Sequence, residues 1–366
     1  MTASLFSPLK LGAVTLAHRV VMAPLTRMRA GPGDVPTAMN VAYYAQRASP
    51  GGLLISEATP VCPQAHGHPD VPGIHTAAQV EGWRAVTEAV HGRGGLMFLQ
   101  LWHTGRTSHS SFQPDGRPAP APSAVRADAD GMTADWKRVP YETPRAVDLA
   151  EIPGIVDSFA AGAANAIAAG FDGVEINGAN GYLLEQFMHT LSNRRGDAYG
   201  GSIENRCRFP LEVVRAVAAR VGADRVGIRL SPFGIANDSG EDDPAPLYSH
   251  LVTAMAPLGL AYLHLVEPRA SGTGRADTLR EDQPSAATLF RPLWPATLLT
   301  AGGFDGTDAA ATVAAGHADA VAFGRFFISN PDLPARIRTG AALTPYDRAT
   351  FYGGGAAGYT DYPSTA

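Results

Sequence analysis

The chain of 366 residues is 45% apolar and 17% charged, with a formal net charge of −5, a balance typical of a compact globular enzyme. The negative charge argues against nucleic acid or an anionic membrane as a partner, and no apolar run reaches the roughly 20 residues that a membrane-spanning helix needs. Cys62 and Cys207 are too few for a disulfide framework or a structural zinc site, and the first residues show no signal-peptide pattern, so we expect a cytoplasmic protein.

The sequence contains two lysines, Lys10 and Lys137. Lys10 precedes the first predicted core strand and Lys137 lies in a long polar segment, so neither is well placed to form a Schiff base in a pocket. The sequence has no Gly-Lys-Ser/Thr phosphate loop, and no G-x-G-x-x-G motif follows a predicted strand. These absences argue against aldolase, pyridoxal, ATP-dependent and Rossmann-type chemistry.

Short apolar or β-branched runs alternate with alanine-rich stretches along the chain, which is the pattern of a parallel sheet with crossover helices. The pattern predicts eight strands, at 20–23, 53–57, 96–101, 173–176, 226–230, 262–266, 297–300 and 320–323. The predicted helices span 37–47, 77–93, 149–169, 203–221, 244–257, 283–290, 306–315 and 332–338. Eight such strands indicate an α/β fold of the (β/α)8 TIM-barrel type, and we expect residues 1–366 to form one domain.

Two segments do not fit a bare barrel. Residues 5–18 alternate around Gly12 and predict a β-hairpin that closes the bottom of the barrel. Residues 103–148, rich in Pro, Ala, Ser and Asp, form a long insertion after the third strand. Loops of this length in a compact domain usually have a function, and this one would cap the carboxyl ends of the strands, where barrel enzymes keep their active sites.

Glycines and an arginine follow the last two predicted strands: Gly302, Gly303, Gly324 and Arg325. Loops at these places form the usual phosphate site of a barrel, because glycines expose backbone N–H groups and an arginine can hold a phosphate with two hydrogen bonds. The alternative is that the glycines only make tight turns. At the other strand ends uncharged polar residues dominate.

Several motifs resemble those of the Old Yellow Enzyme family of FMN-dependent ene-reductases, and especially its N-ethylmaleimide reductase and pentaerythritol tetranitrate reductase branch. They cover nearly the whole chain in order: APLTR at 23–27, LISEAT at 54–59, QLWHTGR at 100–106, NGANGYLLEQF at 177–187, YGGSIENR at 199–206, DAVAFGR at 319–325 and GYTDYP at 358–363. The resemblance implies a non-covalent FMN, NADPH or NADH as hydride donor, and an enone or nitro compound as substrate.

The resemblance also assigns residues to the flavin. Thr26 would bond the flavin C4 carbonyl, Gln100 the pyrimidine edge, and Arg229 the region of N1 and O2, where negative charge collects on reduction. Pro24 and Ala58 would contribute backbone contacts, and the glycines and Arg325 would hold the phosphate. From the residues alone, Thr26 could instead cap its own loop, and Arg229 could form an ion pair inside the barrel.

On the substrate side the resemblance gives Tyr182 as the proton donor, with Trp102, His68 and Tyr352 lining the pocket. Two donors three residues apart would hold the substrate oxygen, and this chain has Asn177 and Asn180 where the family usually has His with His or His with Asn. An amide can donate but cannot become cationic, so substrate preference and rate are open. The amides could also bond only to nearby backbone, and Trp102 could be a core residue.

His68 is a second departure, since this branch commonly has a tyrosine there. His66, His68, His103 and His109 lie on separate predicted loops without metal-ligand spacing, so we expect no metal. Two other functions remain as alternatives: a redox-neutral isomerase or pathway-specific flavoenzyme, and a non-catalytic flavin-binding redox sensor. We expect a monomer or a homodimer.

Overall fold

The computed structural model describes residues 4–269 and 282–364, and its centre is a closed barrel of eight parallel strands. The strands lie where the sequence predicted them, within a few residues: β3 (Val20–Met22), β4 (Leu53–Pro60), β5 (Leu96–Trp102), β10 (Gly173–Gly178), β11 (Val226–Leu230), β12 (Tyr262–Val266), β13 (Leu298–Ala301) and β14 (Ala320–Phe323). Each pairs with its sequence neighbour, and β14 pairs with β3 to close the ring. The predicted (β/α)8 barrel is therefore confirmed.

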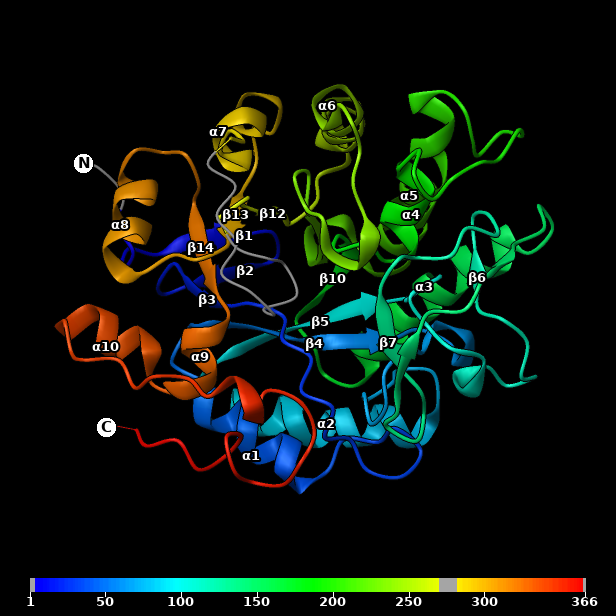
Figure 1. Ribbon diagram of the computed structural model, residues 1–366. Coiled ribbons are helices and arrows are strands. Elements are labelled where there is room, and N and C mark those ends of the chain that lie inside the picture. The colour runs from blue at the N-terminus through cyan, green and yellow to red at the C-terminus, as the bar shows by residue number, and fades with distance from the viewer. Residues whose placement is uncertain (1–3, 270–281, 365–366) are drawn as a thin grey trace.

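Helices surround the strands as an outer layer (Figure 1). They are α1 (Ala38–Arg47), α2 (Ala77–His91), α3 (Ile152–Ala168), α5 (Ile203–Val221), α6 (Pro244–Met255), α7 (Ala286–Phe290), α8 (Gly306–Ala314) and α10 (Leu333–Thr339). The helix predicted at 283–290 is shorter, because Ser285 caps it by accepting a hydrogen bond from the backbone N–H of Thr288. Two short helices were not predicted, α4 (Leu183–Met188) and α9 (Arg325–Ser329), which follow β10 and β14.

The N-terminal hairpin predicted from residues 5–18 is present as β1 (Leu9–Leu11) and β2 (Val14–Leu16), paired antiparallel. Leu11 and Leu16 are fully buried in one cluster with the inward-facing apolar residues of the barrel, so the hairpin closes its bottom. Gly12, at the turn, has a φ of +51°, and a Cβ there would lie 1.9 Å from the backbone oxygen of Asp224. Only glycine fits this close approach.

The insertion between β5 and α3 carries two small sheets. Strands β7 (Asp130–Met132) and β8 (Arg138–Pro140) form an antiparallel hairpin, and β6 (Pro120–Ala121) pairs with β9 (Arg145–Ala146). In Figure 1, β7 lies beyond the arrowheads of β4 and β5, at the carboxyl end of the barrel. The insertion thus lies on the face where the sequence analysis placed it.

The C-terminal segment returns to the barrel beside α1. Arg27, which directly follows Thr26, donates through Nε to the carbonyl of Phe351 over 2.8 Å and through a terminal nitrogen to that of Gly358 over 2.8 Å. The ring of Tyr359 stacks on that of Tyr43 in α1, with 4.1 Å between ring centroids. These contacts fix residues 348–352 over the same end of the barrel as the insertion.

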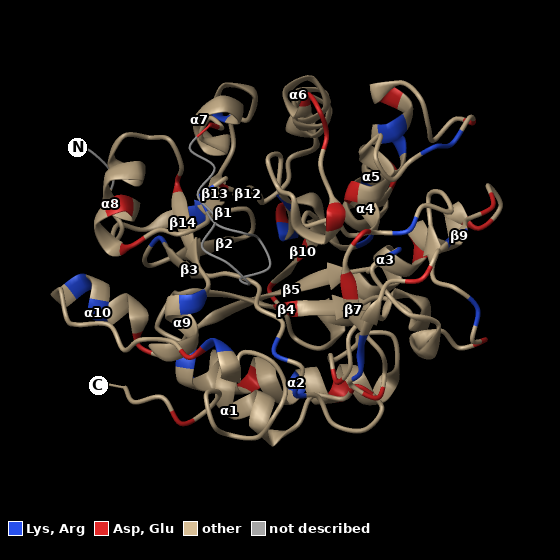
Figure 2. Cartoon of the chain, in the orientation of Figure 1, with Lys and Arg blue, Asp and Glu red and all other residues tan. Residues whose placement is uncertain are grey.

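Charged residues of both signs are distributed along the helices and loops of the chain, as the colours in Figure 2 show. In the ranges 4–269 and 282–364, no helix has the length and apolar character to span a membrane.

Candidate active site

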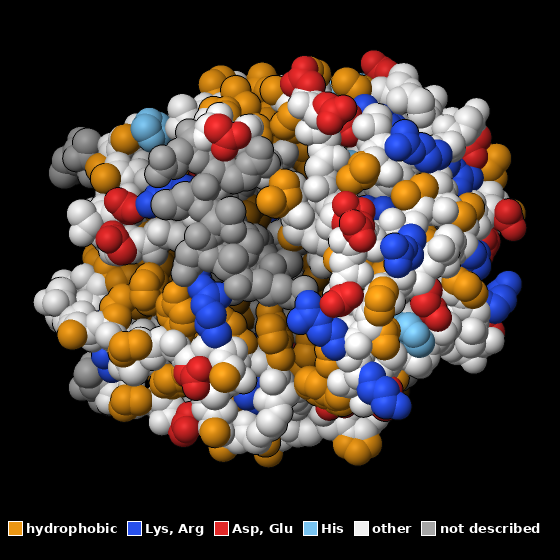
Figure 3. Space-filling view, in the orientation of Figure 1, with side chains coloured by type: hydrophobic (Ala, Val, Ile, Leu, Met, Phe, Trp, Pro, Cys, Tyr) orange, Lys and Arg blue, Asp and Glu red, His pale blue; other side chains and the backbone are white. Residues whose placement is uncertain are grey.

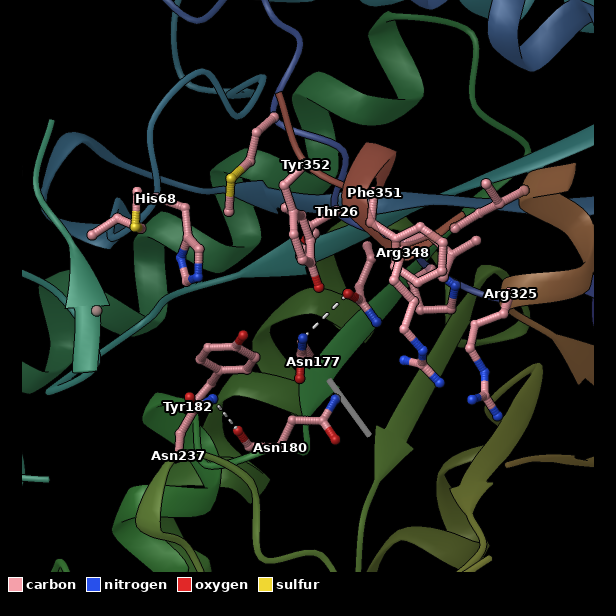
Figure 4. A pocket seen from close by; sticks show the side chains of 18 of the residues that line it. Thr26, His68, Asn177, Asn180, Tyr182, Asn237, Arg325, Arg348, Phe351 and Tyr352 are labelled. Atoms are coloured by element: carbon pink, nitrogen blue, oxygen red, sulfur yellow. Dashed lines mark hydrogen bonds between the residues drawn. The ribbon is translucent and has the colours of Figure 1, made fainter. Parts of the chain in front are cut away.

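A cavity of about 550 Å³ opens at the carboxyl ends of the barrel strands. Hydrophobic side chains line the hollow of this face in Figure 3, and Lys or Arg side chains stand at its edge. Residues predicted for the site share the cavity wall: Pro24, Thr26, Ala58, His68, Gln100, Asn177, Asn180, Tyr182, Arg229, Arg325 and Tyr352. Segments from strands β3, β4, β5, β10, β11 and β14 and from the C-terminal segment therefore meet at one place (Figure 4).

A smaller cavity of about 90 Å³ adjoins the first at the ends of β13 and β14. The three predicted glycines, Gly302, Gly303 and Gly324, line this smaller cavity, which shares Arg229 and Arg325 with the larger one. The guanidinium groups of Arg325 and Arg348 lie 5.5 and 5.4 Å from the ring centroid of Tyr346. Two neighbouring cations beside a glycine-lined pocket are an arrangement that suits an anionic group.

The walls include residues that sequence reasoning missed. Asp130, Gly131, Met132 and Arg138 come from the β7–β8 hairpin. Trp136, at the turn of that hairpin, donates through its indole N–H to the Asp70 carboxylate over 3.2 Å. Arg348 and Phe351 come from the C-terminal segment. The insertion was expected to cover the site, but nothing in its polar sequence indicated which side chains would face inward.

The polar floor of the cavity is a chain of directed hydrogen bonds. Glu175, fully buried on β10, accepts from Gln100 Nε2 over 2.7 Å, from the Tyr262 hydroxyl over 3.1 Å, and pairs with His264 Nδ1 at 2.8 Å. Burial alone would raise the pKa of Glu175, but His264, Arg229 and Gln100 outweigh it and hold that pKa below its usual value. The carboxylate is therefore ionised, and it can only accept.

The direction of the Glu175 bond sets the two amides above it. With Nε2 of Gln100 turned to Glu175, its Oε1 accepts from Asn177 Nδ2 over 3.2 Å, the dashed line at Asn177 in Figure 4. Asn177 Oδ1 in turn accepts the backbone N–H of Ala179 over 3.1 Å. The alternative that the side chain of Asn177 bonds only to nearby backbone is thus wrong, because its nitrogen donates to Gln100. Among the hydrogen bonds of the described residues, the second hydrogen of this amide has no acceptor and can serve a substrate.

Asn180 lies in the left-handed region with a φ of +59°. Its backbone N–H donates to Ser231 Oγ over 2.8 Å, and its carbonyl accepts from Asn237 Nδ2 over 2.9 Å. The side-chain oxygen of Asn180 is buried without a hydrogen-bond partner among the described residues. Its backbone is held on both sides while its side chain points to the cavity (Figure 4).

Arg229 lines both cavities and is 7% exposed. Burial lowers its pKa, and the nearby Glu175 partly offsets this. Within the described ranges no ion pair engages Arg229, and its buried Nε has no hydrogen-bond partner. The predicted alternative of a barrel-interior salt bridge therefore has no support, and an unpartnered buried N–H beside an anion-suited pocket fits the pyrimidine ring of a flavin.

Trp102, which was expected to line the substrate pocket, is not among the residues that form the wall of the larger cavity. Its side chain is fully buried, in a cluster with Met28, Ala58 and Val71. The ring of Tyr182 meets it edge-on, with 4.9 Å between centroids and an interplanar angle of 89°. Trp102 therefore packs against Tyr182, and the His68 ring also contacts it, with 5.3 Å between ring centroids.

Across the described residues, no group of three or more His, Cys, Asp or Glu side chains is arranged to hold a metal ion.

Residues 4–344 match the family described as NADH:flavin oxidoreductase / NADH oxidase. The chain belongs to this family. The 12-oxophytodienoate reductase 1 of Oryza sativa subsp. japonica is 49% identical over 362 residues, which cover 98% of this chain and 92% of that protein. The predicted resemblance to the Old Yellow Enzyme family is confirmed.

Solved structures agree with this membership. Morphinone reductase in complex with tetrahydroNAD is 48% identical, with a TM-score of 0.93, over 100% of this chain and 98% of that one. An old yellow enzyme homologue from Zymomonas mobilis is 42% identical, with a TM-score of 0.93, over 99% of both chains. The protein is thus an NADH:flavin oxidoreductase, which uses a flavin and a nicotinamide cofactor and acts on small molecules.

Proposed function

We propose that this NADH:flavin oxidoreductase binds one FMN non-covalently and reduces activated C=C bonds of α,β-unsaturated carbonyl or nitro compounds with hydride from NADPH or NADH. The observation that carries the proposal is the convergence of Tyr182, Asn177 and Asn180 on one cavity that continues into a glycine- and arginine-lined pocket. The larger cavity has room for a ring system and a small substrate, and the smaller one suits a phosphate.

The residues around the cavities can hold FMN at several points. Gln100 keeps a second amide hydrogen and a second lone pair for the pyrimidine edge, since its other bonds go to Glu175 and Asn177. Arg229 offers its unpartnered Nε, and Thr26, Pro24 and Ala58 line the same wall. Gly302, Gly303, Gly324 and Arg325 would take the phosphate. FMN would supply the hydride that reaches the substrate.

The remaining residues would act on the substrate. Asn177 and Asn180 hold its carbonyl or nitro oxygen by donating amide hydrogens, which stabilises negative charge that develops there. Tyr182 keeps its proton at neutral pH in water, where a phenol has a pKa of about 10, and it would protonate the α-carbon. His68 and Tyr352 shape the walls. FMN rather than FAD is proposed because no dinucleotide-binding fold accompanies the barrel in the described ranges.

The experiment is a colour test on the purified protein under anaerobic conditions. Boiling should release a yellow compound that co-elutes with FMN, and NADPH or NADH should bleach the native protein. Adding 2-cyclohexenone should then restore the colour. Release of FAD, or colour that stays on the denatured chain, contradicts the cofactor assignment.

The absence of a histidine from the Asn177–Asn180 pair favours one other function, a redox-neutral isomerase or pathway-specific flavoenzyme. Without a cationic imidazole the site provides a weaker field for an oxyanion. An isomerase would convert substrate without consuming a nicotinamide equivalent for each product. A non-catalytic redox sensor, the remaining alternative, would bleach with NADPH but would not recolour with the enone.

A further inference from the structure

A second buried carboxyl group, Glu185 in α4, lies behind the loop that carries Asn180 and Tyr182. Glu185 is fully buried and accepts three hydrogen bonds. Its Oε2 accepts the backbone N–H of Gly181 over 2.5 Å, and its Oε1 accepts the hydroxyls of Ser231 over 2.6 Å and Tyr248 over 2.7 Å. None of these three partners lines the larger cavity.

Two of these bonds connect Glu185 to the residues proposed to act on the substrate. Ser231 Oγ, which donates to Glu185, accepts the backbone N–H of Asn180 over 2.8 Å. The bonded N–H of Gly181 belongs to the residue between Asn180 and Tyr182. The carbonyl oxygen of Gly181 itself accepts a hydrogen bond from Gln186 Nε2 over 2.8 Å. The loop is therefore held by consecutive side chains of α4, and Glu185 holds it at two points.

The donors around Glu185 all run toward it. His189 Nδ1 accepts the backbone N–H of Gly240 over 3.2 Å, and burial lowers the pKa of His189 to about 3, so the neutral ring carries its proton on Nε2. His189 Nε2 lies 3.0 Å from the Tyr248 hydroxyl oxygen and donates a hydrogen bond to it. The Tyr248 hydroxyl in turn donates to Glu185. In the second branch of the network, the backbone N–H of Asn180 donates to the Ser231 hydroxyl, which donates to Glu185. Every hydrogen in both branches points to the carboxyl group.

Such a network fits an ionised carboxylate and conflicts with a protonated one. A proton on Oε2 would meet the N–H of Gly181, and a proton on Oε1 would meet two hydroxyl hydrogens. One of the two hydroxyls would have to turn away from Oε1, and when that hydroxyl is Ser231, its oxygen still accepts from Asn180 but no longer donates to Glu185. Protonation therefore loosens the connection between Glu185 and Asn180.

We propose that Glu185 is a positioning residue whose ionised carboxylate holds Asn180 and Tyr182 in place for substrate reduction, so that this half-reaction weakens when Glu185 takes up a proton. The proposal rests on the proposed ene-reductase function. It concerns a residue outside the cavity wall, which acts through Ser231 and Gly181 and touches neither substrate nor flavin.

The surroundings of Glu185 place its titration in the neutral range. Burial raises the pKa of Glu185 to about 7, although the bonds from Ser231, Tyr248 and Gly181 oppose the rise. The other titratable groups on this side are His189, Tyr248 and Cys207, and burial holds the pKa of the Tyr248 hydroxyl well above its usual value and raises that of Cys207 to about 12. Arg206 is paired with Glu241 at 3.1 Å, and Arg106 with Asp238 at 3.3 Å. The shifts of His189, Tyr248 and Cys207 thus all carry their pKa values away from neutrality, whereas the shift of Glu185 brings its pKa toward it.

The test follows reoxidation of the pre-reduced holoenzyme by 2-cyclohexenone at a series of pH values. In the wild type the rate should fall about tenfold from pH 8 to pH 6, as expected when only the ionised form of one group is competent. Glu185→Gln should abolish this dependence and react at the slow, low-pH rate, because glutamine resembles the protonated acid. Flavin reduction by NADPH, which needs no acid, should change by no more than a few-fold in either protein.

Two variants separate positioning from other effects. Glu57→Gln is the matched comparison, because Glu57 is also fully buried with a pKa raised by burial to about 7. It accepts from Arg27 N–H and the Tyr44 hydroxyl and does not touch the Asn180 loop. The pH dependence should persist in Glu57→Gln. Ser231→Ala breaks the link to Asn180 and should slow reoxidation at pH 8, while Glu185 still titrates.

Thermal unfolding provides a second measurement that does not depend on activity. A carboxyl group with a raised pKa in the folded protein contributes a stability that is present below the unfolded-state pKa and is lost as pH rises through about 7. The unfolding midpoint of Glu185→Gln should therefore rise relative to that of the wild type between about pH 4.5 and pH 7, and the difference should level off above pH 7. This difference supports the titration of Glu185 even if the enone is not a substrate.

A pH dependence of reoxidation that survives in Glu185→Gln, or that disappears in Glu57→Gln, would overturn the proposal. So would a difference between the unfolding midpoints of wild type and Glu185→Gln that stays the same across the pH range. A wild-type protein that does not react with the enone at any pH contradicts the proposed function alone, and the unfolding profiles then decide whether Glu185 titrates as proposed.

Discussion

Asn177 donates a side-chain hydrogen bond to Gln100 over 3.2 Å, which joins the proposed substrate-binding amide to the proposed flavin-binding amide. The bond has one direction, because Gln100 must turn its nitrogen to the Glu175 carboxylate below it. A buried negative charge therefore orients two polar groups of the site that could otherwise rotate by half a turn without changing shape.

Glu175→Gln should raise the reduction potential of the bound flavin. The change removes a buried negative charge near Arg229. The negative charge of the reduced flavin is then repelled less, which favours reduction. We expect the equilibrium constant for flavin reduction to change by about tenfold, which corresponds to a shift of about 30 mV in the potential of a two-electron couple. A dye-equilibrated titration measures it, and Tyr262→Phe, which removes one bond to Glu175 but no charge, should shift the potential much less. An unchanged or lowered potential in Glu175→Gln would contradict the electrostatic role.

Asn177→Ala should slow reduction of an enone by about 10²-fold or more, which is typical for the loss of one donor to a developing oxyanion. Flavin reduction by NADPH should be nearly unchanged, and stopped-flow measurement of both half-reactions checks this. Asn177→His should add an inflection between about pH 5 and pH 8, since an imidazole titrates there and an amide does not. If Asn177→Ala reduces the enone at the wild-type rate, Asn177 and Asn180 have only a structural role, and the isomerase becomes the better-supported function.

Tyr182→Phe should separate the two half-reactions. Reduction of the flavin should stay within a few-fold, while enone reduction should fall by about 10²–10⁴, the usual contribution of a positioned general acid. Nitroalkenes should be affected less, because water can protonate a nitronate. Equal losses in both half-reactions would mean that Tyr182 only shapes the cavity.

Arg325→Ala should weaken retention of FMN more than it slows the chemistry. The change removes charge-assisted hydrogen bonds to the phosphate, worth roughly 1.5–3 kcal/mol. The dissociation constant of FMN, measured on reconstituted apoprotein, should rise by at least about tenfold. A variant that purifies with a full complement of flavin but without activity would argue against a phosphate-binding role for Arg325.

The sequence was sufficient for the barrel because every core strand is a short apolar run followed by a helix with its own start signal. Thr76, for example, caps α2 together with Gln79. The strand ends were predictable for the same reason, since parallel strands bring Thr26, Gln100 and Arg229 to one end of the barrel. Short helices such as α4 were missed because six residues carry too little periodicity.

Other parts of the site depend on contacts between segments far apart in sequence. Trp102 ends β5 and Tyr182 follows β10, but only the structure shows that their rings pack against each other. Phe351 reaches the cavity because Arg27 holds its carbonyl, a pairing that spans 324 positions in sequence. Glu185 looks like an ordinary helix residue in sequence. Its proposed role depends on two partners that are distant in sequence, Ser231 directly after β11 and Tyr248 in α6.

A single turnover tests the central claim most directly. Holoenzyme reduced with one equivalent of NADPH per flavin is mixed anaerobically with 2-cyclohexenone, and both the flavin absorbance and the product are measured. The proposed function predicts that the yellow colour returns and that one cyclohexanone forms per flavin, with both processes slowed together in Tyr182→Phe. A flavin that stays bleached until oxygen is admitted, or an enone recovered unchanged or merely isomerised, would contradict it.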